Sequence, residues 1–358
     1  VVLAVLLTLV MTWICVLGTE LSARLQNALI LAQVGALVAF AVVALVHVVR
    51  GQVPADAPSL SIEWLNPFGA GGAALTGGLL LGVFAYWGWE SAVNLTEETS
   101  DSASAPGRAA VLSTVILLGS YLSVAIALVA VVGPTFLADN AEEEEFIFAI
   151  LAERVLGGWD WVVLLAVTTS AIASTQTTII PASRTALSMA RRGAIPATFG
   201  RIHPRFRTPD VATWWVAGIA IGWYLLLTLT SENALFDSLT ALSLLIAFYY
   251  ALTGFASAIY YRRRLLESVR NVLLIGVGPV LGALMLLWLL VVSVRDMSDP
   301  ENSYTGQAWL GVGPPLVIGV AVSVVGVILM VVARARGGAF WAERPSVADP
   351  DLVAGRPR

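Results

Sequence analysis

The decisive stretch of this chain is Gly82-Val-Phe-Ala-Tyr-Trp-Gly-Trp-Glu-Ser-Ala-Val-Asn-Leu-Thr-Glu-Glu98. One carboxylate, Glu90, lies inside an otherwise apolar segment that is rich in aromatic residues and glycine. A carboxylate in hydrocarbon costs about 3 kcal/mol or more, so it usually faces a cavity, an ion or a partner. Glycine residues in the same segment weaken the helix at the membrane depth where this carboxylate lies. The stretch therefore predicts a membrane helix that is broken near Gly88 and carries an ionisable group at the break.

Composition places the whole chain in the membrane. The 358 residues are 58% hydrophobic and only 12% charged, with a mean hydropathy of +0.83. Soluble domains carry about a quarter charged residues, so the charge deficit decides the class. We predict an all-α polytopic protein whose surroundings are the lipid bilayer. A single cysteine, Cys15, excludes a disulfide within the chain and a cysteine-built metal site.

Apolar segments of membrane-spanning length recur along the chain. A helix needs roughly 20 apolar residues to cross a bilayer. This length predicts nine spans in a transmembrane domain over 1–334, followed by a disordered tail over 335–358. The spans are expected at about 1–18, 25–49, 73–96, 109–133, 161–183, 211–230, 238–260, 271–294 and 310–333.

Arginine distribution predicts the orientation. All 20 basic residues are arginine, and 17 of them fall on one side if the loop after the first span is placed in the cytoplasm. Positive residues favour the cytoplasmic side, so we expect a multi-pass protein of the plasma or inner membrane with a cytoplasmic C-terminus. Residue 1 then lies outside the cell. From this we expect an odd number of spans before Val1 and treat the chain as a fragment.

The carboxylates of the decisive stretch have two interpretations each. On helical spacing Glu90 shares a face with Tyr86, Trp87 and Asn94. It is either a proton-titrating or substrate-facing group, or a buried acid paired with a neighbouring helix. Glu97 and Glu98 lie at the cytoplasmic end of the span. They either form an inner gate with an arginine, for which we select Arg184, or are solvated.

Aromatic residues surround the expected break. Phe84, Tyr86 and Trp87 lie too deep for an interfacial belt, so they either pack the bundle or line a substrate pocket. Gly88 lies inside this aromatic cluster, where a break would expose backbone N–H and C=O groups. We therefore expect the break at Gly88. The other glycines of the helix are explained by close packing against neighbouring helices.

The fifth predicted span is unusually polar. Eight hydroxyl or amide side chains lie between Thr168 and Thr178, including Ser170, Ser174 and Thr175. Such residues can line an aqueous cavity, bind a cation through oxygen atoms, or join helices by hydrogen bonds. Their density indicates that part of the stripe faces a cavity.

Other chemistry has no support in the sequence. The chain contains no glycine-rich phosphate loop, no His-x-x-x-His or Cys-x-x-Cys motif and no basic nucleic-acid surface. We therefore expect neither an enzyme nor a nucleic-acid-binding protein. No cofactor or metal is expected, apart from a transported H⁺ or Na⁺.

The motifs together resemble those of the amino acid–polyamine–organocation (APC) superfamily of permeases. The resemblance is carried by Phe84–Glu90, Glu97-Glu98, Ala105-Pro-Gly-Arg108, Ser183–Pro196 and His203–Pro209, in this order and spacing. It covers essentially the whole chain. It implies a LeuT-type fold with two inverted repeats of five helices, of which this chain would hold the family's fourth to twelfth spans and lack the first three.

The resemblance also implies roles for individual residues. The broken helix would contact substrate through Phe84, Ala85, Tyr86, Trp87 and Gly88. Glu90 matches an acidic position that some members use in proton coupling. Ser170, Ser174 and Thr175 fall near hydroxyls that hold sodium in sodium-driven relatives. Gln33 departs from the pattern, because many proton-coupled members have a lysine there and glutamine carries no charge.

Three functional hypotheses follow. The first is a secondary transporter for an amino acid or related amine that is coupled to protons and works by alternating access. The second is a sodium-coupled symporter or an exchanger of another small solute on the same fold. The third is a transport-dead sensor or scaffold, or a non-functional fragment.

Overall fold

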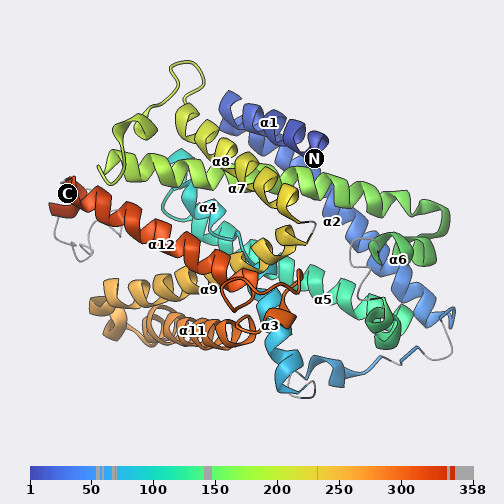
Figure 1. Cartoon of the computed structure of the whole chain (residues 1–358). Coiled ribbons are helices and arrows are strands. Elements are labelled where there is room, and N and C mark those ends of the chain that lie inside the picture. The colour runs from blue at the N-terminus through green and yellow to red at the C-terminus, as the bar shows by residue number, and fades with distance from the viewer. Residues whose placement is uncertain are drawn as a thin grey trace.

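The computed structural model is a bundle of helices (Figure 1). It describes residues 1–53, 57–58, 60–66, 69, 71–140, 147–231, 233–336 and 339–342. Within these ranges the regular structure is helical, apart from one isolated bridge between Trp309 and Val312. Most of the predicted tail over 335–358 lies outside the described residues.

The helices follow one another along the chain, with longer connections between α2 and α3 and between α7 and α8. Their bounds are α1 Val2–Leu17, α2 Thr19–Val49, α3 Gly72–Ala85, α4 Ser91–Asn94, α5 Ala105–Asp139, α6 Ile147–Leu156, α7 Trp161–Arg191, α8 Asp210–Thr230, α9 Ala234–Tyr260, α10 Val269–Asn271, α11 Gly278–Asp296, α12 Pro314–Ala335 and α13 Ala339–Ala342. A π-helical segment, Val272–Val277, joins α10 to α11, so this span runs continuously over Val269–Asp296.

The prediction of nine spans is wrong as a count of continuous membrane helices. Within the described residues, seven helices are long and apolar enough to cross a membrane. The predicted span 1–18 is a helix of 16 residues, shorter than the roughly 20 that a bilayer needs. The predicted span 73–96 is interrupted, because α3 ends at Ala85 and α4 begins only at Ser91.

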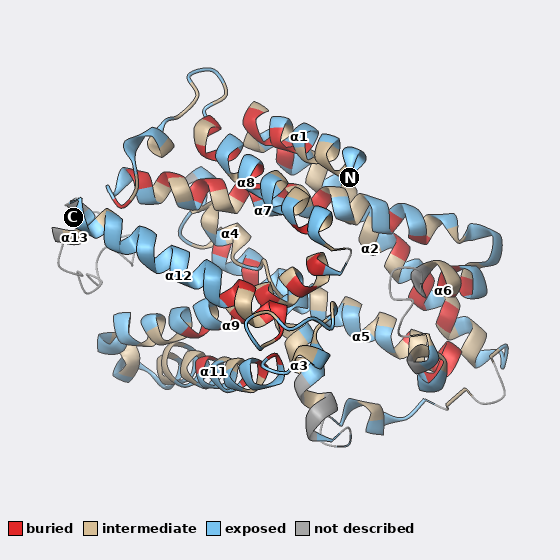
Figure 2. Ribbon diagram, viewed as in Figure 1, coloured by how far each residue is buried: buried red, intermediate tan, exposed pale blue. Residues whose placement is uncertain are grey.

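The outer surface is apolar, as a lipid-facing surface must be. Side chains such as Leu281 on α11 and Val327 on α12 are 60% and 54% exposed. Figure 2 shows that α12 is pale blue along most of its length, whereas buried residues gather where α1, α7 and α8 meet. The described helices thus bury small residues against one another and leave large aliphatic ones for the lipid.

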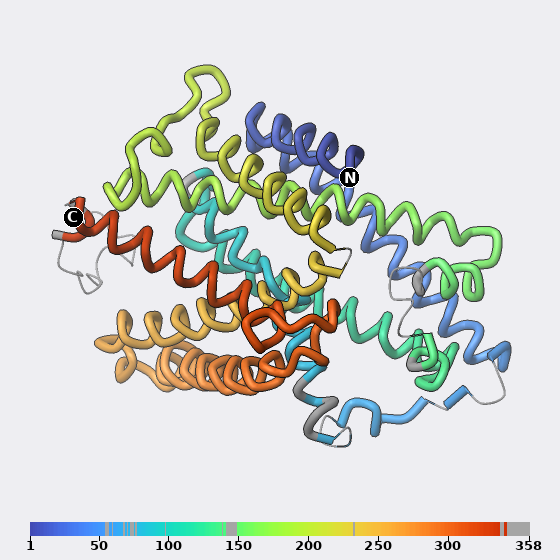
Figure 3. The backbone as a smooth tube through the Cα atoms, in the orientation of Figure 1, coloured from blue at the N-terminus to red at the C-terminus, as the bar shows by residue number. Residues whose placement is uncertain are grey.

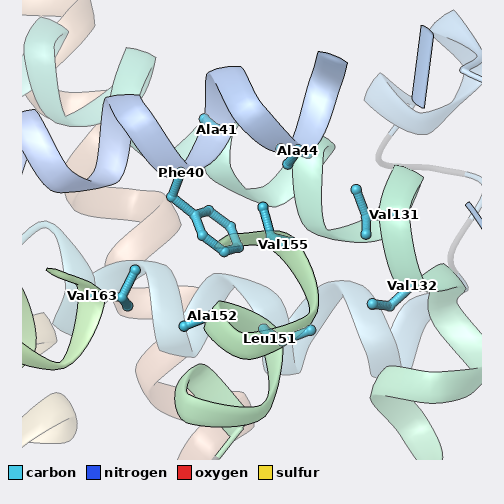
Figure 4. Close-up of a cluster of buried hydrophobic side chains, with 10 residues drawn as sticks. Phe40, Ala41, Ala44, Val131, Val132, Leu151, Ala152, Val155 and Val163 are labelled. Atoms are coloured by element: carbon cyan, nitrogen blue, oxygen red, sulfur yellow. The ribbon is translucent and has the colours of Figure 1, made fainter. Parts of the chain in front are cut away.

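A short amphipathic helix covers one end of the bundle. The acidic run before residue 147 predicts a short helix, and α6 is found at Ile147–Leu156, while residues 141–146 lie outside the described part. Leu151, Ala152 and Val155 of α6 pack against Phe40 and Ala44 of α2 (Figure 4). Val163 of α7 joins the same cluster, which therefore ties the end of α2 to the start of α7.

Helix α9 packs closely against α11 and also contacts α12 (Figure 1). Gly254 permits the approach of α9 to α11. A Cβ atom at Gly254 would lie 2.8 Å from the carbonyl oxygen of Pro279 and 3.0 Å from Cβ of Ala283. Both neighbours belong to α11. The two helices therefore lie too close together at this point to accommodate a side chain on residue 254 unless one of them shifts.

Replacing Gly254 with alanine is therefore expected to destabilise the protein by about 1–3 kcal/mol, because overpacking forces the backbone to shift. The melting temperature in detergent measures the effect. Gly326→Ala on α12 is the matched control, since a Cβ there meets no atom of the described residues within 4 Å outside its own helix backbone. Equal melting temperatures for the two variants would show that α9 and α11 are not held at this distance.

Candidate functional site

The α3–α4 segment contains the predicted helix break. Residues 86–90 form turns between α3 and α4 (Figure 3), and Gly88 has φ of +112°. This backbone region is readily accessible only to glycine. The sequence hypothesis that Gly88 lies at a break therefore agrees with the backbone of the structure.

Gly88→Ala is expected to cost about 1–3 kcal/mol, because alanine would be strained at this φ. Apart from its chain neighbours, no atom of the described residues lies within 4 Å of the position of the added Cβ, so the penalty comes from the backbone alone. Gly78→Ala, in helical backbone and equally free of contacts, is the control and should be neutral or stabilising. The comparison is made by thermal unfolding, and a loss in Gly78→Ala equal to that in Gly88→Ala would contradict the strain.

Two adjacent tyrosines of α9 bind the carboxylate at the break. Tyr249 Oη donates to Glu90 Oε1 at 2.7 Å, and Tyr250 Oη donates to Oε2 at 2.5 Å. The backbone N–H of Gly88 donates to Oε2 at 3.2 Å. Three donors therefore surround one carboxylate, which has no arginine partner among the described residues.

Aromatic side chains extend this network. Trp87 Nε1 donates to Tyr249 Oη at 2.8 Å, and the rings of Trp89 and Tyr250 lie 5.7 Å apart between centroids. We call Glu90, Trp87, Tyr249 and Tyr250 the Glu90 cluster. It joins the break to α9 through hydrogen bonds.

The opposite side of the break is held by α5. Tyr121 Oη donates to the carbonyl oxygen of Ala85 at 2.8 Å, one of the acceptors left unpaired where α3 ends. The Tyr86 ring packs edge-on against Tyr121 with centroids 5.5 Å apart. The face shared by Glu90, Tyr86 and Trp87, expected from helical spacing, is thus not formed, because residues 86–90 are not helical.

Aromatic residues of the break also line a cavity of about 400 Å³. Its wall combines Tyr86 and Trp89 with Tyr250 of α9 and Leu286 of α11. Phe84, 38% exposed, lies 6.5 Å from Trp87 between ring centroids. The structure thus brings the predicted residues Phe84 to Gly88 and Glu90 into one region.

A second polar cluster joins the short helix η3, Thr96–Glu98, to α7 and the start of α2. Arg184 Nε lies 2.8 Å from Glu98 Oε1, and its Nη2 donates to Thr19 Oγ1 at 3.0 Å. The Thr19 hydroxyl in turn donates to Glu98. Arg184 is 5% exposed and Glu98 32% exposed at the side chain. We call these three residues the Arg184 cluster; the side chain of Glu97 lies outside the described part.

The electrostatics of the Arg184 cluster favour the charged carboxylate. Burial alone would raise the pKa of Glu98, but hydrogen bonds from Arg184 and Thr19 outweigh burial, so the pKa is lowered below its usual value. Beside the cluster lies a cavity of about 610 Å³ whose wall includes Asn94, Ser188 and Arg207. Glu98 and Arg184 themselves line this cavity, so the Arg184 cluster lies at its edge.

The candidate ion-binding residues are separate from both clusters. No hydrogen bond among the described residues connects Ser170, Ser174 or Thr175 to Glu90 or Arg184. Thr175 Oγ1 donates to the carbonyl oxygen of Ala171 at 3.0 Å, within its own helix. Gln33 has a buried Nε2 without a partner in the described part of the chain.

Sequence reasoning missed Tyr249 and Tyr250. Two consecutive tyrosines in the middle of an apolar span place two hydroxyls at membrane depth, and buried tyrosine hydroxyls usually find a partner. The two tyrosines therefore indicate a polar contact inside the bundle, but the sequence does not identify Glu90 as the acceptor.

Comparison with known proteins assigns a family. The model of the family described as amino acid permease matches residues 1–322. An uncharacterized transporter of Mycobacterium tuberculosis is 36% identical over 130 residues, which cover 35% of this chain and 28% of that protein.

Two mammalian relatives match over a longer stretch. The large neutral amino acids transporter small subunit 2 of Mus musculus is 27% identical over 208 residues, 58% of this chain and 38% of the relative. The Asc-type amino acid transporter 1 of Homo sapiens is 28% identical over 210 residues, 58% of this chain and 39% of the relative. The match thus spans less than half the length of each of these relatives. Since the family model covers most of the chain, this protein belongs to the amino acid permease family.

Proposed function

We propose that the protein is a secondary transporter for an amino acid or a related amine and works by alternating access. Family membership supports transport, and relatives named as amino acid transporters support the substrate class. We also propose a LeuT-type arrangement of inverted repeats in the cell membrane, with the arginine-rich loops and the C-terminal end in the cytoplasm. The arginine bias supports this orientation.

The substrate site in this proposal is the break in the α3–α4 segment. Interrupted membrane helices offer unpaired backbone groups and helix ends to polar solutes at membrane depth. Here Phe84, Ala85, Tyr86, Trp87 and Gly88 would supply aromatic surface and backbone groups. The single observation that carries the proposal is the carboxylate held at this break by hydrogen bonds from a second helix.

Glu90 is the proposed proton-coupling residue. As a carboxylate it accepts from Tyr249, Tyr250 and Gly88. A protonated carboxyl carries its own donor and has less acceptor capacity, so it cannot keep all of these bonds in the same form. Proton uptake would therefore loosen the break from α9, and proton release would fasten it again.

The Arg184 cluster is the proposed cytoplasmic gate. It links η3, directly after the broken helix, to α7 and α2 through Glu98 and Thr19. Alternating access requires that one end of the pathway opens while the other is closed. Separation of Glu98 from Arg184 would open the 610 Å³ cavity toward the break.

Sodium coupling is the second candidate mechanism. The hydroxyls of Ser170 and Ser174 have no hydrogen-bond partner among the described residues, which leaves their oxygens free to bind a cation. Hard cations prefer such oxygen ligands.

Uptake into proteoliposomes that contain the intact protein tests the proposal. Radiolabelled neutral amino acids are offered with an inward proton gradient, and separately with an inward sodium gradient at equal pH. We expect accumulation with the proton gradient, abolished by a protonophore. Accumulation with sodium alone would favour sodium coupling over proton coupling. No uptake or exchange of any amino acid or amine would contradict the proposed function.

A further inference from the structure

Arg207 lines the cavity of about 610 Å³ without a partner of its own. Its guanidinium forms no hydrogen bond or ion pair with any described residue. The acid in the described part of the wall is Glu98, and Glu98 is already paired with Arg184. A charge on the wall of a cleft attracts ligands of opposite sign more strongly than a charge in open water does. The wall therefore offers Arg207 to an anion.

A tightly bonded turn holds Arg207 at this wall. It belongs to the loop 192–209 between α7 and α8 (Figure 1), and its φ of +55° is uncommon for a residue other than glycine. The N–H of Arg207 donates to the carbonyl oxygen of His203 at 2.9 Å, and the N–H of His203 donates to that of Thr208 at 2.8 Å. Thr208 is 2% exposed, and its hydroxyl donates to the carbonyl oxygen of Val16, near the end of α1, at 2.6 Å. Such strained backbone persists where its surroundings enforce it, and it gathers at ligand sites.

Three more polar side chains on the wall have no partner. The amide of Asn94 and the hydroxyls of Thr185 and Ser188 line the same cavity and form no hydrogen bond with the described residues. Helical hydroxyls can instead donate to the carbonyl oxygen four residues earlier, as Thr175 does on the same helix. Donors from α4, from α7 and from the loop that carries Arg207 thus line one cavity.

The cavity adjoins the broken helix. Val93 and Asn94 of α4 form part of its wall, and the N–H of Asn94 donates to the carbonyl oxygen of Glu90 at 3.0 Å. The wall therefore begins one helical turn from the carboxylate at the break. The cavity is the space next to the proposed substrate site on the side of the Arg184 cluster.

We propose that this cavity contains a second solute site, in which Arg207 binds the carboxylate of an amino acid at the cytoplasmic end of the pathway. The inference rests on the proposed transport of amino acids and gives the His203–Pro209 motif a role. A guanidinium binds a carboxylate through two parallel hydrogen bonds, and the hydroxyls of Thr185 and Ser188 can donate to the same group. The volume lies within the range of small-molecule sites, roughly 300–1,000 Å³.

Transport measured from each face of the membrane tests this site in the intact protein. Inside-out membrane vesicles present the cytoplasmic face to added amino acid, and right-side-out vesicles present the other face. Arg207→Asn removes the charge, and asparagine tolerates the left-handed backbone. We expect the KM on the cytoplasmic face to rise roughly tenfold or more, as for loss of a hydrogen bond to a charged group. The KM on the other face should change far less.

Two more variants complete the experiment. Arg205→Asn is the matched control, because Arg205 belongs to the same turn but lies outside the described wall of the cavity, and both KM values should stay unchanged. Ser188→Ala keeps the helix and removes one hydroxyl, so it tests the site even if Arg207→Asn does not fold. For Ser188→Ala we expect a severalfold rise of the KM on the cytoplasmic face.

Two further solutes identify the group that Arg207 binds. The amine with the same side chain lacks the carboxylate, so Arg207→Asn should not alter its inhibition of transport from the cytoplasmic face. An equal rise for amine and amino acid would overturn the proposal. Inhibition by inorganic phosphate that Arg207→Asn removes, with an unchanged KM, would overturn it as well and assign the cavity to a phosphate-bearing ligand.

Failure of this site is distinguishable from failure of the proposed function. Absence of amino acid transport by the unmodified protein would contradict the proposed function itself. Normal transport, with the same KM on the cytoplasmic face in the unmodified protein, Arg207→Asn and Ser188→Ala, would contradict the carboxylate site alone.

Discussion

Glu90→Gln is expected to abolish most of the pH dependence of amino acid uptake by the intact protein. The amide keeps the size of the side chain but cannot take up or release a proton. Coupling between two binding sites typically amounts to about 1–3 kcal/mol, so we expect a roughly 5- to 150-fold loss of acid-stimulated uptake. Initial uptake rates measured from acid to neutral pH give the loss, and the KM for substrate should change far less.

Two sets of controls support this experiment. Glu63→Gln removes an exposed carboxylate from the η1 helix, Ile62–Leu65, and should leave the pH profile unchanged. Tyr249→Phe and Tyr250→Phe each remove one donor to Glu90 and should shift the pH profile without flattening it. An unaltered pH profile in Glu90→Gln would exclude Glu90 as the coupling residue.

Arg184→Met is expected to destabilise the protein by roughly 2–4 kcal/mol. Removal of one partner from a buried ion pair leaves the other charge uncompensated. The lower part of this range applies if water reaches Glu98, whose side chain is 32% exposed. Thr19 and Ser183 also lose their hydrogen bonds from the guanidinium. The melting temperature in detergent measures the effect.

Arg24→Met is the matched control, because Arg24 pairs with Glu20 on the exposed surface of α2. Exposed pairs of this kind contribute about 0.5 kcal/mol or less. Equal melting temperatures for Arg184→Met and Arg24→Met would contradict a stabilising role for the Arg184 cluster.

The Arg184 cluster also predicts an acid dependence of stability. The folded-state pKa of Glu98 is lower than its unfolded value, so its stabilisation is present above the unfolded pKa. It is lost as the pH falls through the folded pKa. Glu98→Gln should therefore reduce stability at pH 7 and weaken the further loss toward acid pH. A melting temperature at pH 7 equal to that of the unmodified protein would contradict this.

The broken helix was predictable because its causes are local. Gly88 and the apolar residues around Glu90 stand within one short stretch, and both the backbone preference of glycine and the cost of a buried charge act there. The predicted span 73–96 was nevertheless counted as one continuous helix, because hydropathy measures how apolar a segment is and not whether its helix is interrupted. The membrane class followed from composition and needed no structural detail.

The partners of the site residues were not predictable in the same way. Tyr249 and Tyr250 lie 159 and 160 residues from Glu90 in the chain, so their contacts depend on how α9 packs. Arg184 was selected together with Glu98 from charge and expected position. Their contact over 86 residues, and the part played by Thr19, come from tertiary structure.

Amide hydrogen exchange of the intact protein tests the central claim, that solute binds at the break between α3 and α4. The exchange is followed by mass spectrometry with and without a saturating concentration of the transported amino acid. The account predicts slower exchange in peptides that cover residues 84–92 and no change in α12, Pro314–Ala335. Unchanged exchange over 84–92, with protection elsewhere, would contradict it.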